Sequence, residues 1–200
     1  VPMRLKDGIL IVVLITDGLA IYAAADLRTI ATTPWKTRFN TNGTTPIVVG
    51  NEIFVSTGYG KGCGLFRFTG SSLQNVYTNT DMANHMANCV LIDGHLYGYN
   101  GNAHPRSTRV QIVCMEWSTG KVKWAERGLG CGTVIAAGKT LVLLSDVGEL
   151  VLAPATTSGF KPTARAQVLD GKCWTPPALA DGRVFCRNVA GDVVRVVVGK

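Results

Sequence analysis

Val134-Ile135-Ala136-Ala137-Gly138-Lys139-Thr140-Leu141-Val142-Leu143-Leu144-Ser145 consists of two short apolar runs joined by a glycine turn. Runs of β-branched and aliphatic residues that are broken by glycine are typical of β-hairpins. The same arrangement recurs along the chain, and its turn glycines lie 42, 44, 44 and 44 residues apart, at Gly8, Gly50, Gly94, Gly138 and Gly182. A fixed period of this length, built from strands, predicts the blades of a β-propeller.

Each repeat contains a third apolar run after a second turn, and the first four repeats contain a fourth, more polar run. These fourth runs are Trp35–Thr37, Gln74–Tyr77, Lys121–Trp124 and Ala166–Val168. We therefore expect an all-β chain of four-stranded antiparallel blades, with innermost strands buried between neighbouring blades and outermost strands facing solvent. The blades are expected at residues 1–37, 44–78, 88–126, 132–168 and 176–200, with residues 1–5 as the first innermost strand.

The fifth repeat stops after its third strand, so about four and a half blades are expected in the chain. No segment at the beginning of the chain is left over to supply the missing strand. This favours part of a larger ring of about seven or eight blades over a closed small ring or a ring completed by a second chain.

The charge and hydropathy of the chain exclude two classes of partner. Its net charge is +7, but its 20 lysines and arginines are scattered over strand ends and turns, which predicts a solvated basic surface and no nucleic-acid partner. The apolar stretch from Gly8 to Ala25 has the length of a signal peptide or membrane span. Because Asp17-Gly18 interrupts it in the register of the other turns, we expect a hairpin and no membrane span.

The cysteine spacing predicts structural thiols and no metal site. The six cysteines include no Cys-x-x-Cys pair, which argues against structural zinc, whereas their even number permits disulfides in an exported protein. Cys186 lies four residues after its turn glycine, as Val12, Phe54 and Val142 do. This shared register predicts a small buried side chain, and we expect most of the six cysteines to be free.

One segment resembles a known family. Cys114-Met115-Glu116-Trp117-Ser118-Thr119-Gly120-Lys121-Val122-Lys123-Trp124 resembles the tryptophan-docking repeat of PQQ-like propellers, in the quinoprotein alcohol dehydrogenase-like superfamily. Ala24–Thr29, followed by Trp35, is similar to a second copy. The resemblance implies that Thr119-Gly120 forms the turn between the third and fourth strands. It also implies that Trp35 and Trp124 pack against the next blade, and burial of each indole would contribute about 2–3 kcal/mol.

The family contains quinoprotein dehydrogenases and non-enzymatic exported proteins. The chain lacks the adjacent cysteines and the acidic calcium ligands of the dehydrogenases, and is more similar to exported members such as the outer-membrane assembly lipoprotein. The resemblance implies a periplasmic or extracellular scaffold, with a signal peptide upstream, no catalytic residue and no cofactor. Its partner would be a protein or a small ligand. A quinoprotein-type oxidoreductase with PQQ and calcium at the channel mouth and a carbohydrate-binding propeller remain the alternatives.

The loops that precede the innermost strands form the predicted site, because function concentrates in loops on a rigid scaffold. His85 is a candidate base or a hydrogen-bonding plug, and Trp174 could stack on a ring or fill the channel. Tyr99–Thr108 lengthens one hairpin, either for a partner or as a solvated insertion. Gly58–Gly62 lacks the following helix of a phosphate loop. The candidate channel-mouth residues are Asn42, Thr44, Asn84, His85, Cys131, Trp174 and Thr175.

Overall fold

The computed structural model describes residues 1–85, 87–103 and 109–198, and every regular element among them is a β-strand. The first sheet contains β1 (Pro2–Leu5), β2 (Gly8–Ile15), β3 (Gly18–Ala23) and β4 (Thr29–Pro34). The second contains β5 (Ile47–Val49), β6 (Glu52–Thr57), β7 (Gly62–Phe68) and β8 (Leu73–Asn79). The third contains β9 (Val90–Ile92), β10 (His95–Asn100), β11 (Gln111–Glu116) and β12 (Val122–Glu126). The fourth contains β13 (Thr133–Ala137), β14 (Thr140–Leu144), β15 (Glu149–Pro154) and β16 (Ala164–Gln167), and the fifth β17 (Ala178–Ala180), β18 (Arg183–Arg187) and β19 (Val193–Val197).

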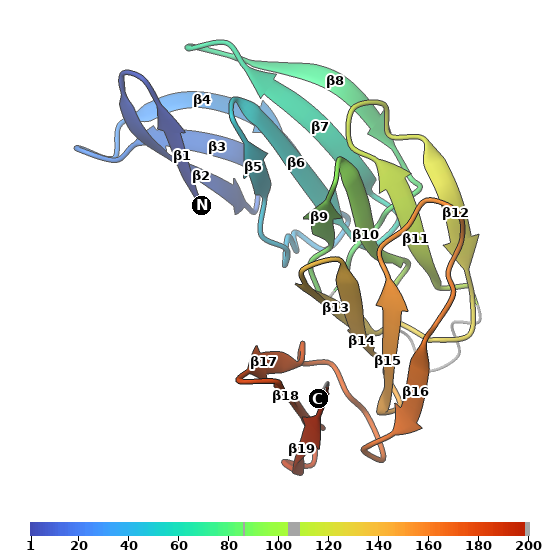
Figure 1. The fold of residues 1–200 in the computed structure, drawn as a ribbon. Coiled ribbons are helices and arrows are strands. Elements are labelled where there is room, and N and C mark those ends of the chain that lie inside the picture. The colour runs from blue at the N-terminus through green and yellow to red at the C-terminus, as the bar shows by residue number, and fades with distance from the viewer. Residues whose placement is uncertain (86, 104–108, 199–200) are drawn as a thin grey trace.

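The five sheets follow one another around an arc, with β1–β4 at one end and β17–β19 at the other (Figure 1). Within each sheet the strands are antiparallel neighbours in chain order, as in β1-β2-β3-β4. Strands β9 and β13 lie on the inner side of the arc, and β8, β12 and β16 lie on the outer side (Figure 1). The predicted all-β architecture of four-stranded antiparallel blades, with a three-stranded fifth sheet, is confirmed.

The core is divided into layers between successive blades. The described residues form four buried apolar clusters, and each cluster takes side chains from two neighbouring sheets. Strand β14 shows how this arises, because Leu141 and Leu143 face the third blade while Val142 and Leu144 face the fifth. Since alternate residues of a strand point to opposite faces, a strand buried on both faces is apolar throughout.

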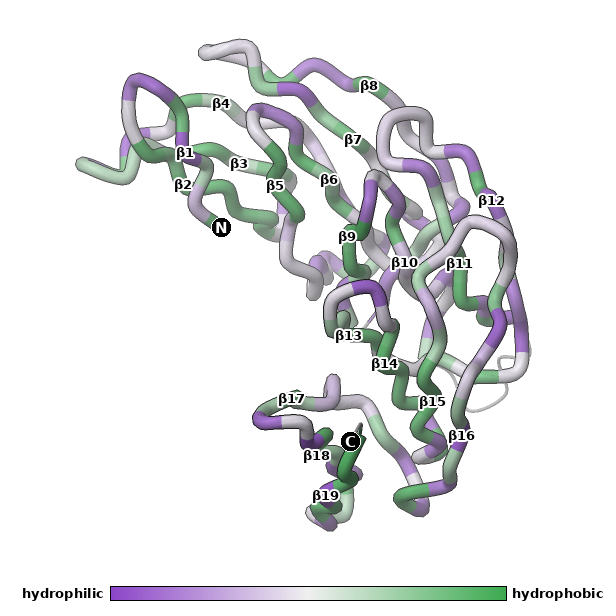
Figure 2. Tube along the Cα trace, in the orientation of Figure 1, coloured by the Kyte–Doolittle hydropathy of each residue, from purple (hydrophilic) through white to green (hydrophobic). Residues whose placement is uncertain are grey.

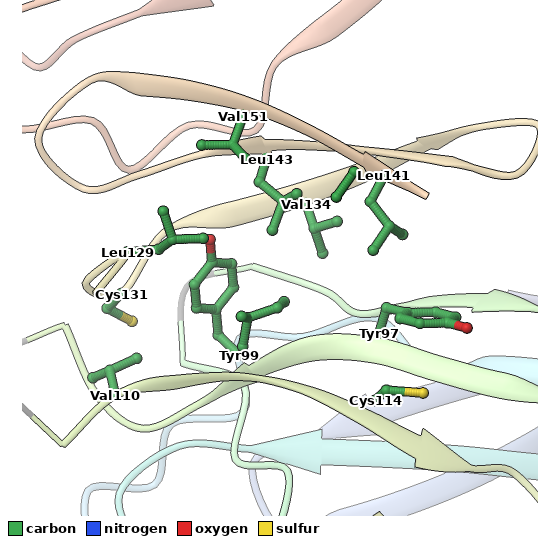
Figure 3. Packing of buried hydrophobic residues seen from close by; sticks show 12 residues of the cluster. Tyr97, Tyr99, Val110, Cys114, Leu129, Cys131, Val134, Leu141, Leu143 and Val151 are labelled. Atoms are coloured by element: carbon green, nitrogen blue, oxygen red, sulfur yellow. The ribbon is translucent and has the colours of Figure 1, made fainter. Parts of the chain in front are cut away.

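The cluster between the third and fourth blades illustrates the packing (Figure 3). Leu141 and Val134 of the fourth blade point towards the third blade, where Tyr97 and Cys114 belong to the same cluster. The ring of Tyr99 extends towards Leu129, which lies in the loop that connects the two blades. Blade and connecting loop are therefore held by one continuous apolar contact.

Burial across a blade differs from the predicted gradient. The middle strands are the most deeply buried, whereas the innermost strands β5 and β9 are only partly buried. The prediction that innermost strands are buried is thus wrong for these two strands and for β17, which is exposed throughout. Residues of β5 and β9 such as Val48 and Leu91 pack only against the margins of the interblade clusters and stay partly exposed. The outermost strands β8, β12 and β16 are largely exposed, as predicted, and carry more hydrophilic residues than β14 and β15 (Figure 2).

Two other local predictions have clear outcomes. The apolar stretch after Gly8 is the hairpin β2–β3, as expected, and no helix among the described residues is long and apolar enough to cross a membrane. The fourth strand of the first blade, in contrast, is Thr29–Pro34 and not Trp35–Thr37. β4 pairs with β3 as far as Pro34, which lies opposite Gly18, the first residue of β3. Beyond it, one further main-chain hydrogen bond runs from the Trp35 N–H to the Asp17 carbonyl at 3.1 Å, in the turn that precedes β3.

All six cysteines are buried free thiols, and Cys186 is 1% exposed, in agreement with its register. Burial raises the pKa of Cys63 to about 12 and that of Cys186 to about 11. These thiols are therefore protonated at neutral pH, as expected for cysteines that serve as apolar core residues.

Candidate binding groove

Thr44 and Asn84 belong to a buried hydrogen-bond chain that joins the second and third blades. The Thr44 hydroxyl donates to the carbonyl of Ser56, and the Ser56 hydroxyl accepts the N–H of Asn84 at 2.9 Å. The Asn84 side-chain amide donates to the carbonyl of Tyr99 at 2.9 Å. Because Thr44 is 8% and Asn84 2% exposed, these two predicted residues fix loops in place and offer little surface to a ligand.

Asn42 also satisfies backbone groups. Its Nδ2 donates to the carbonyls of Ile15 at 2.7 Å and Trp35 at 3.0 Å, and its Oδ1 accepts the hydroxyl of Thr57 at 3.3 Å. One side chain thus connects the ends of β2, β4 and β6. Polar residues at the positions predicted for a ligand are in this case structural partners of the main chain.

His85 lies between the second and third blades. Its Nδ1 accepts the N–H of Ala103 at 3.1 Å, so the neutral ring carries its proton on Nε2. The Nε2 atom is buried and has no hydrogen-bond partner among the described residues. Burial lowers the pKa of His85, which keeps the ring neutral at pH 7.

The remaining three predicted residues lie on the fourth and fifth blades. Cys131 is 5% exposed, and its thiol lies 3.8 Å from the carbonyl of Gly101. It therefore contacts the loop of the third blade that follows β10. The ring of Trp174 lies under the Lys172 ammonium at 4.2 Å, and the Thr175 hydroxyl accepts from Arg187 at 3.0 Å. In the described part of the chain, Trp174 and Thr175 have no hydrogen bond or aromatic contact with the other five predicted residues.

A groove of about 740 Å³ lies beside His85, at the loops of the first three blades. Of its eleven described lining residues, only His85 is among the predicted channel-mouth residues, and the four residues from Asn100 to Ala103 belong to the segment predicted as a possible insertion. The groove is lined by Phe39, Tyr59, Gly60, Thr80, Ala83, His85, Asn100, Gly101, Asn102, Ala103 and Arg109. Of the predicted insertion, residues 104–108 lie outside the described residues.

Tyr59 is held in an unusual backbone conformation at the edge of this groove. Its φ is 58°, in the left-handed region that a bulky side chain rarely adopts. The Tyr59 N–H donates to Oδ1 of Asn102 at 2.6 Å, and the preceding Gly58 approaches so closely that a Cβ would meet His85 and Asn102 at 2.8 Å. The third blade therefore holds this turn, and the conformation directs the Tyr59 ring to a fixed place.

Aromatic residues on the fourth strands join successive blades. Trp124 donates from Nε1 to the Thr156 carbonyl of the fourth blade at 2.7 Å, and its ring contacts those of Tyr97 and Phe160 at 6.0 and 5.7 Å. Tyr77 makes the corresponding contact in the second blade, where its hydroxyl donates to the Trp117 carbonyl at 2.9 Å. In both cases the acceptor lies in the turn between the third and fourth strands of the next blade.

Trp35 occupies a different position from Trp124 despite the spacing of two periods between them. The bulges of the third and fourth strands place Trp124 opposite Cys114, Tyr77 opposite Leu65 and Ala31 opposite Ile21. Ala31 is thus the structural counterpart of Trp124. Trp35 contacts the second blade at its other end, where its Nε1 donates to the Thr57 hydroxyl at 2.8 Å and its ring meets Phe66 edge-on.

Trp117 is an interblade residue that sequence reasoning missed. It is 8% exposed, packs against Phe54 of the preceding blade and donates from Nε1 to the Glu52 carboxylate at 2.8 Å. Glu52 also pairs with Arg67 at 2.8 Å. These two hydrogen bonds hold the pKa of Glu52 below its ordinary value, because both favour the ionised carboxylate. The sequence feature that could have indicated this role is the position of Trp117 just before the Thr119-Gly120 turn.

The groove's donor set does not suit a calcium ion or the cofactor that would accompany it. Its lining contains amide, hydroxyl and imidazole groups and the guanidinium of Arg109, but no carboxylate. Calcium sites in proteins rely on acidic oxygen ligands, and a neighbouring guanidinium repels the ion. In the described residues as a whole, no three histidine, cysteine, aspartate or glutamate side chains form a group that could hold a metal ion.

Comparison with known proteins supports the fold. No family model and no curated protein sequence matches the chain. Among solved structures, BamB from Moraxella catarrhalis matches with a TM-score of 0.68 and 15% identity, over 97% of this chain and 56% of BamB. The computationally designed Ika8 protein matches with a TM-score of 0.66 and 9% identity, over 98% of this chain and 57% of Ika8. The designed Ika4 protein matches with a TM-score of 0.56 and 11% identity, over 77% of this chain and 89% of Ika4.

The chain thus spans a little over half the length of the first two structures. At 15% identity or less, these similarities establish a shared fold and nothing further. Together with the antiparallel sheets and the interblade clusters, they identify the chain as a β-propeller array that resembles BamB.

Proposed function

We propose that this chain is a non-catalytic propeller that serves as a scaffold for binding another protein. The observation that carries the proposal is the groove beside His85. Its walls are aromatic and polar side chains held by hydrogen bonds across two blades, such as that from Tyr59 to Asn102. A rigid, partly apolar groove built from loops is the usual form of a recognition site. Export to the periplasm or the cell exterior belongs to the same proposal and rests on the family resemblance.

The environment of His85 supports binding over catalysis by this residue. Its Nδ1 is occupied by the Ala103 N–H, its Nε2 is buried, and burial lowers its pKa. A general base needs an accessible acceptor nitrogen within reach of the substrate proton. In this arrangement the ring fixes the loops around Tyr59 and offers no such nitrogen.

Photo-cross-linking tests the proposal directly. A p-benzoylphenylalanine residue placed at position 39, whose native Phe39 is 58% exposed in the groove, should yield a discrete protein adduct in the cells of origin. The same residue at position 76, where Val76 is 38% exposed on β8, is the matched control. Adducts at neither position, or equally at both, would contradict a binding role for the groove.

A second experiment separates this function from the quinoprotein alternative. The purified chain is titrated with PQQ in the presence and absence of calcium, while absorbance and dye reduction are followed. We expect no saturable signal, because the groove offers no carboxylate to calcium. A saturable, calcium-dependent signal would contradict the scaffold function and support a quinoprotein-type oxidoreductase.

A further inference from the structure

Three rings from three separate loops meet at the groove. The Phe39 ring, between β4 and β5, meets Tyr59 edge-on at 4.8 Å, and Tyr59 meets His85 edge-on at 4.7 Å. Phe39 is nevertheless 58% exposed. A single exposed aromatic residue needs no explanation, but this one is supported by a ring that is itself held in a left-handed turn.

The same region carries positive charge that is not neutralised. Arg109 lines the groove, Arg38 stacks on Phe39 at 5.4 Å, and Lys61 lies 4.6 Å over the Trp35 ring. None of these three cations forms an ion pair with a described residue, whereas six other lysines and arginines do. Asp81, which follows Thr80, is the one acidic residue next to a lining residue in the sequence, so the local charge is positive.

The two asparagine side chains of the groove direct their acceptors inward, to the protein. Asn100 Oδ1 accepts the Ala83 N–H at 3.1 Å, and Asn102 Oδ1 accepts the Tyr59 N–H at 2.6 Å. Both acceptors are thus used internally, while the two Nδ2 groups have no acceptor among the described residues. These two amide groups and the Arg109 guanidinium are donors only, and the Tyr59 and Thr80 hydroxyls can also donate, so the groove suits a ligand rich in acceptors.

We propose that the groove binds an acidic segment of a protein partner, with one aromatic or large aliphatic side chain against Phe39 and Tyr59. Carboxylates of the segment pair with Arg38 and Arg109, and its backbone carbonyls accept from Asn100 and Asn102. Guanidinium groups favour carboxylates, and a central aromatic contact contributes much of the affinity in such interfaces. A neutral glycan fits less well, because it has no carboxylate to pair with the guanidinium groups of Arg38 and Arg109.

The inference rests on the proposed binding function and is tested by peptide display. A library of random dodecapeptides is panned against the chain, and enriched peptides are synthesised and titrated by fluorescence anisotropy. We expect aspartate and glutamate on both sides of one aromatic or large aliphatic residue. Affinity should fall as salt rises from about 50 to about 300 mM, because exposed charges are then screened.

Two variants and two controls show whether such peptides occupy the groove. Phe39→Ala should weaken binding at least about 10-fold and Arg109→Gln about 3- to 10-fold. Val76→Ala and Lys121→Gln make matched changes on β8 and in the β11–β12 turn, away from the groove lining, and should leave affinity unchanged. Circular dichroism of each variant checks that the fold is retained.

The outcomes separate this inference from the proposed function. Failure to enrich any peptide, a basic or neutral consensus, enrichment of glycans but not peptides on a parallel array, or binding insensitive to both groove variants would overturn the acidic-segment proposal. If a protein adduct still forms at position 39, the scaffold function survives and only the ligand class is wrong. If no adduct forms there, the binding function itself fails.

Discussion

At the scale of single residues, the contacts between blades are made by aromatic side chains with polar ends. Trp124 and Tyr77 pack their rings on apolar neighbours and donate to a backbone carbonyl of the next blade. Such residues combine a large buried area with one directional hydrogen bond. They therefore fix how one blade lies against the next, which apolar packing alone leaves less defined.

Replacing Trp124 should separate these two contributions. Trp124→Phe keeps a ring between Tyr97 and Phe160 but removes the donor to the Thr156 carbonyl, and we expect a loss of about 1–2 kcal/mol in the free energy of unfolding. Trp124→Ala removes the ring as well and should cost about 3 kcal/mol. Urea denaturation measures both, with Val76→Ala as an exposed control; equal losses for the two variants would contradict the model of a separate hydrogen-bond contribution.

At the scale of elements, the turn between the third and fourth strands of a blade makes contact with the preceding blade. Gly120 has φ of 68°, and a Cβ there would meet the Tyr77 ring and Asn79 Nδ2 at 2.7 Å. The glycine is needed for two reasons, the left-handed backbone and the approach of the neighbouring blade. The Thr-Gly pair of the sequence motif thus marks an interface and not only a turn.

Gly120→Ala should therefore destabilise the chain more than an alanine in an open turn. Gly138 is the matched control, since its φ is 57° and nothing lies within 4 Å of an added Cβ. We expect about 1 kcal/mol for Gly138→Ala, from backbone strain alone, and at least about 2 kcal/mol for Gly120→Ala. Thermal and urea unfolding measure the difference, and equal effects would show that Tyr77 moves aside without cost.

The contact of Glu52 with Arg67 and Trp117 should make the interface between the second and third blades sensitive to acid. Folding lowers the pKa of Glu52 from its ordinary value of 4.5, so the unfolded chain binds this proton more tightly than the folded chain. The stabilisation is complete above pH 4.5 and is lost as the pH falls through the folded pKa. Glu52→Gln should lower the free energy of unfolding by about 1–2 kcal/mol at pH 7, and by progressively less as the pH falls below 4.5.

Denaturant unfolding of both proteins from about pH 7 to about pH 3 measures this difference. Glu126→Gln, at an exposed residue with no ion pair among the described side chains, controls for the loss of one negative charge. A difference between wild type and Glu52→Gln that stays constant over the whole pH range would show that the charge of Glu52 contributes nothing.

At the scale of the whole molecule, stability is shared between neighbours around the arc. Strand β10 places Leu96 in the cluster with the second blade, and Tyr97 and Tyr99 in the cluster with the fourth. Strand β18 contributes Val184 and Cys186 to one cluster, while alternate residues such as Phe185 are exposed. In a repeat array, each unit is stabilised mainly by its contacts with adjacent units.

Hydrogen exchange should reveal the difference between strands that are buried on both faces and strands that are buried on one face or exposed. The amides of β10 and β14, which are covered on both faces, should exchange most slowly, and those of β17–β19 should exchange at least about 10-fold faster. Mass spectrometry of peptic fragments resolves these strands. Equal protection of β18 and β10 would mean that the array unfolds as one unit and that local packing does not limit its opening.

The sequence alone determined the repeat, the strand order within a blade and the hairpin after Gly8, because turn glycines and alternating burial are local properties of the chain. It also led to Trp124, Cys186 and the loops around His85. The tertiary structure decided which positions are equivalent and which residues meet. The bulges align Trp124 with Ala31 and not with Trp35, and packing brings Phe39, Tyr59 and Arg109 together from separate loops. Register shifts and contacts between distant loops depend on how neighbouring sheets pack, and the spacing of the turn glycines in the sequence does not specify that packing.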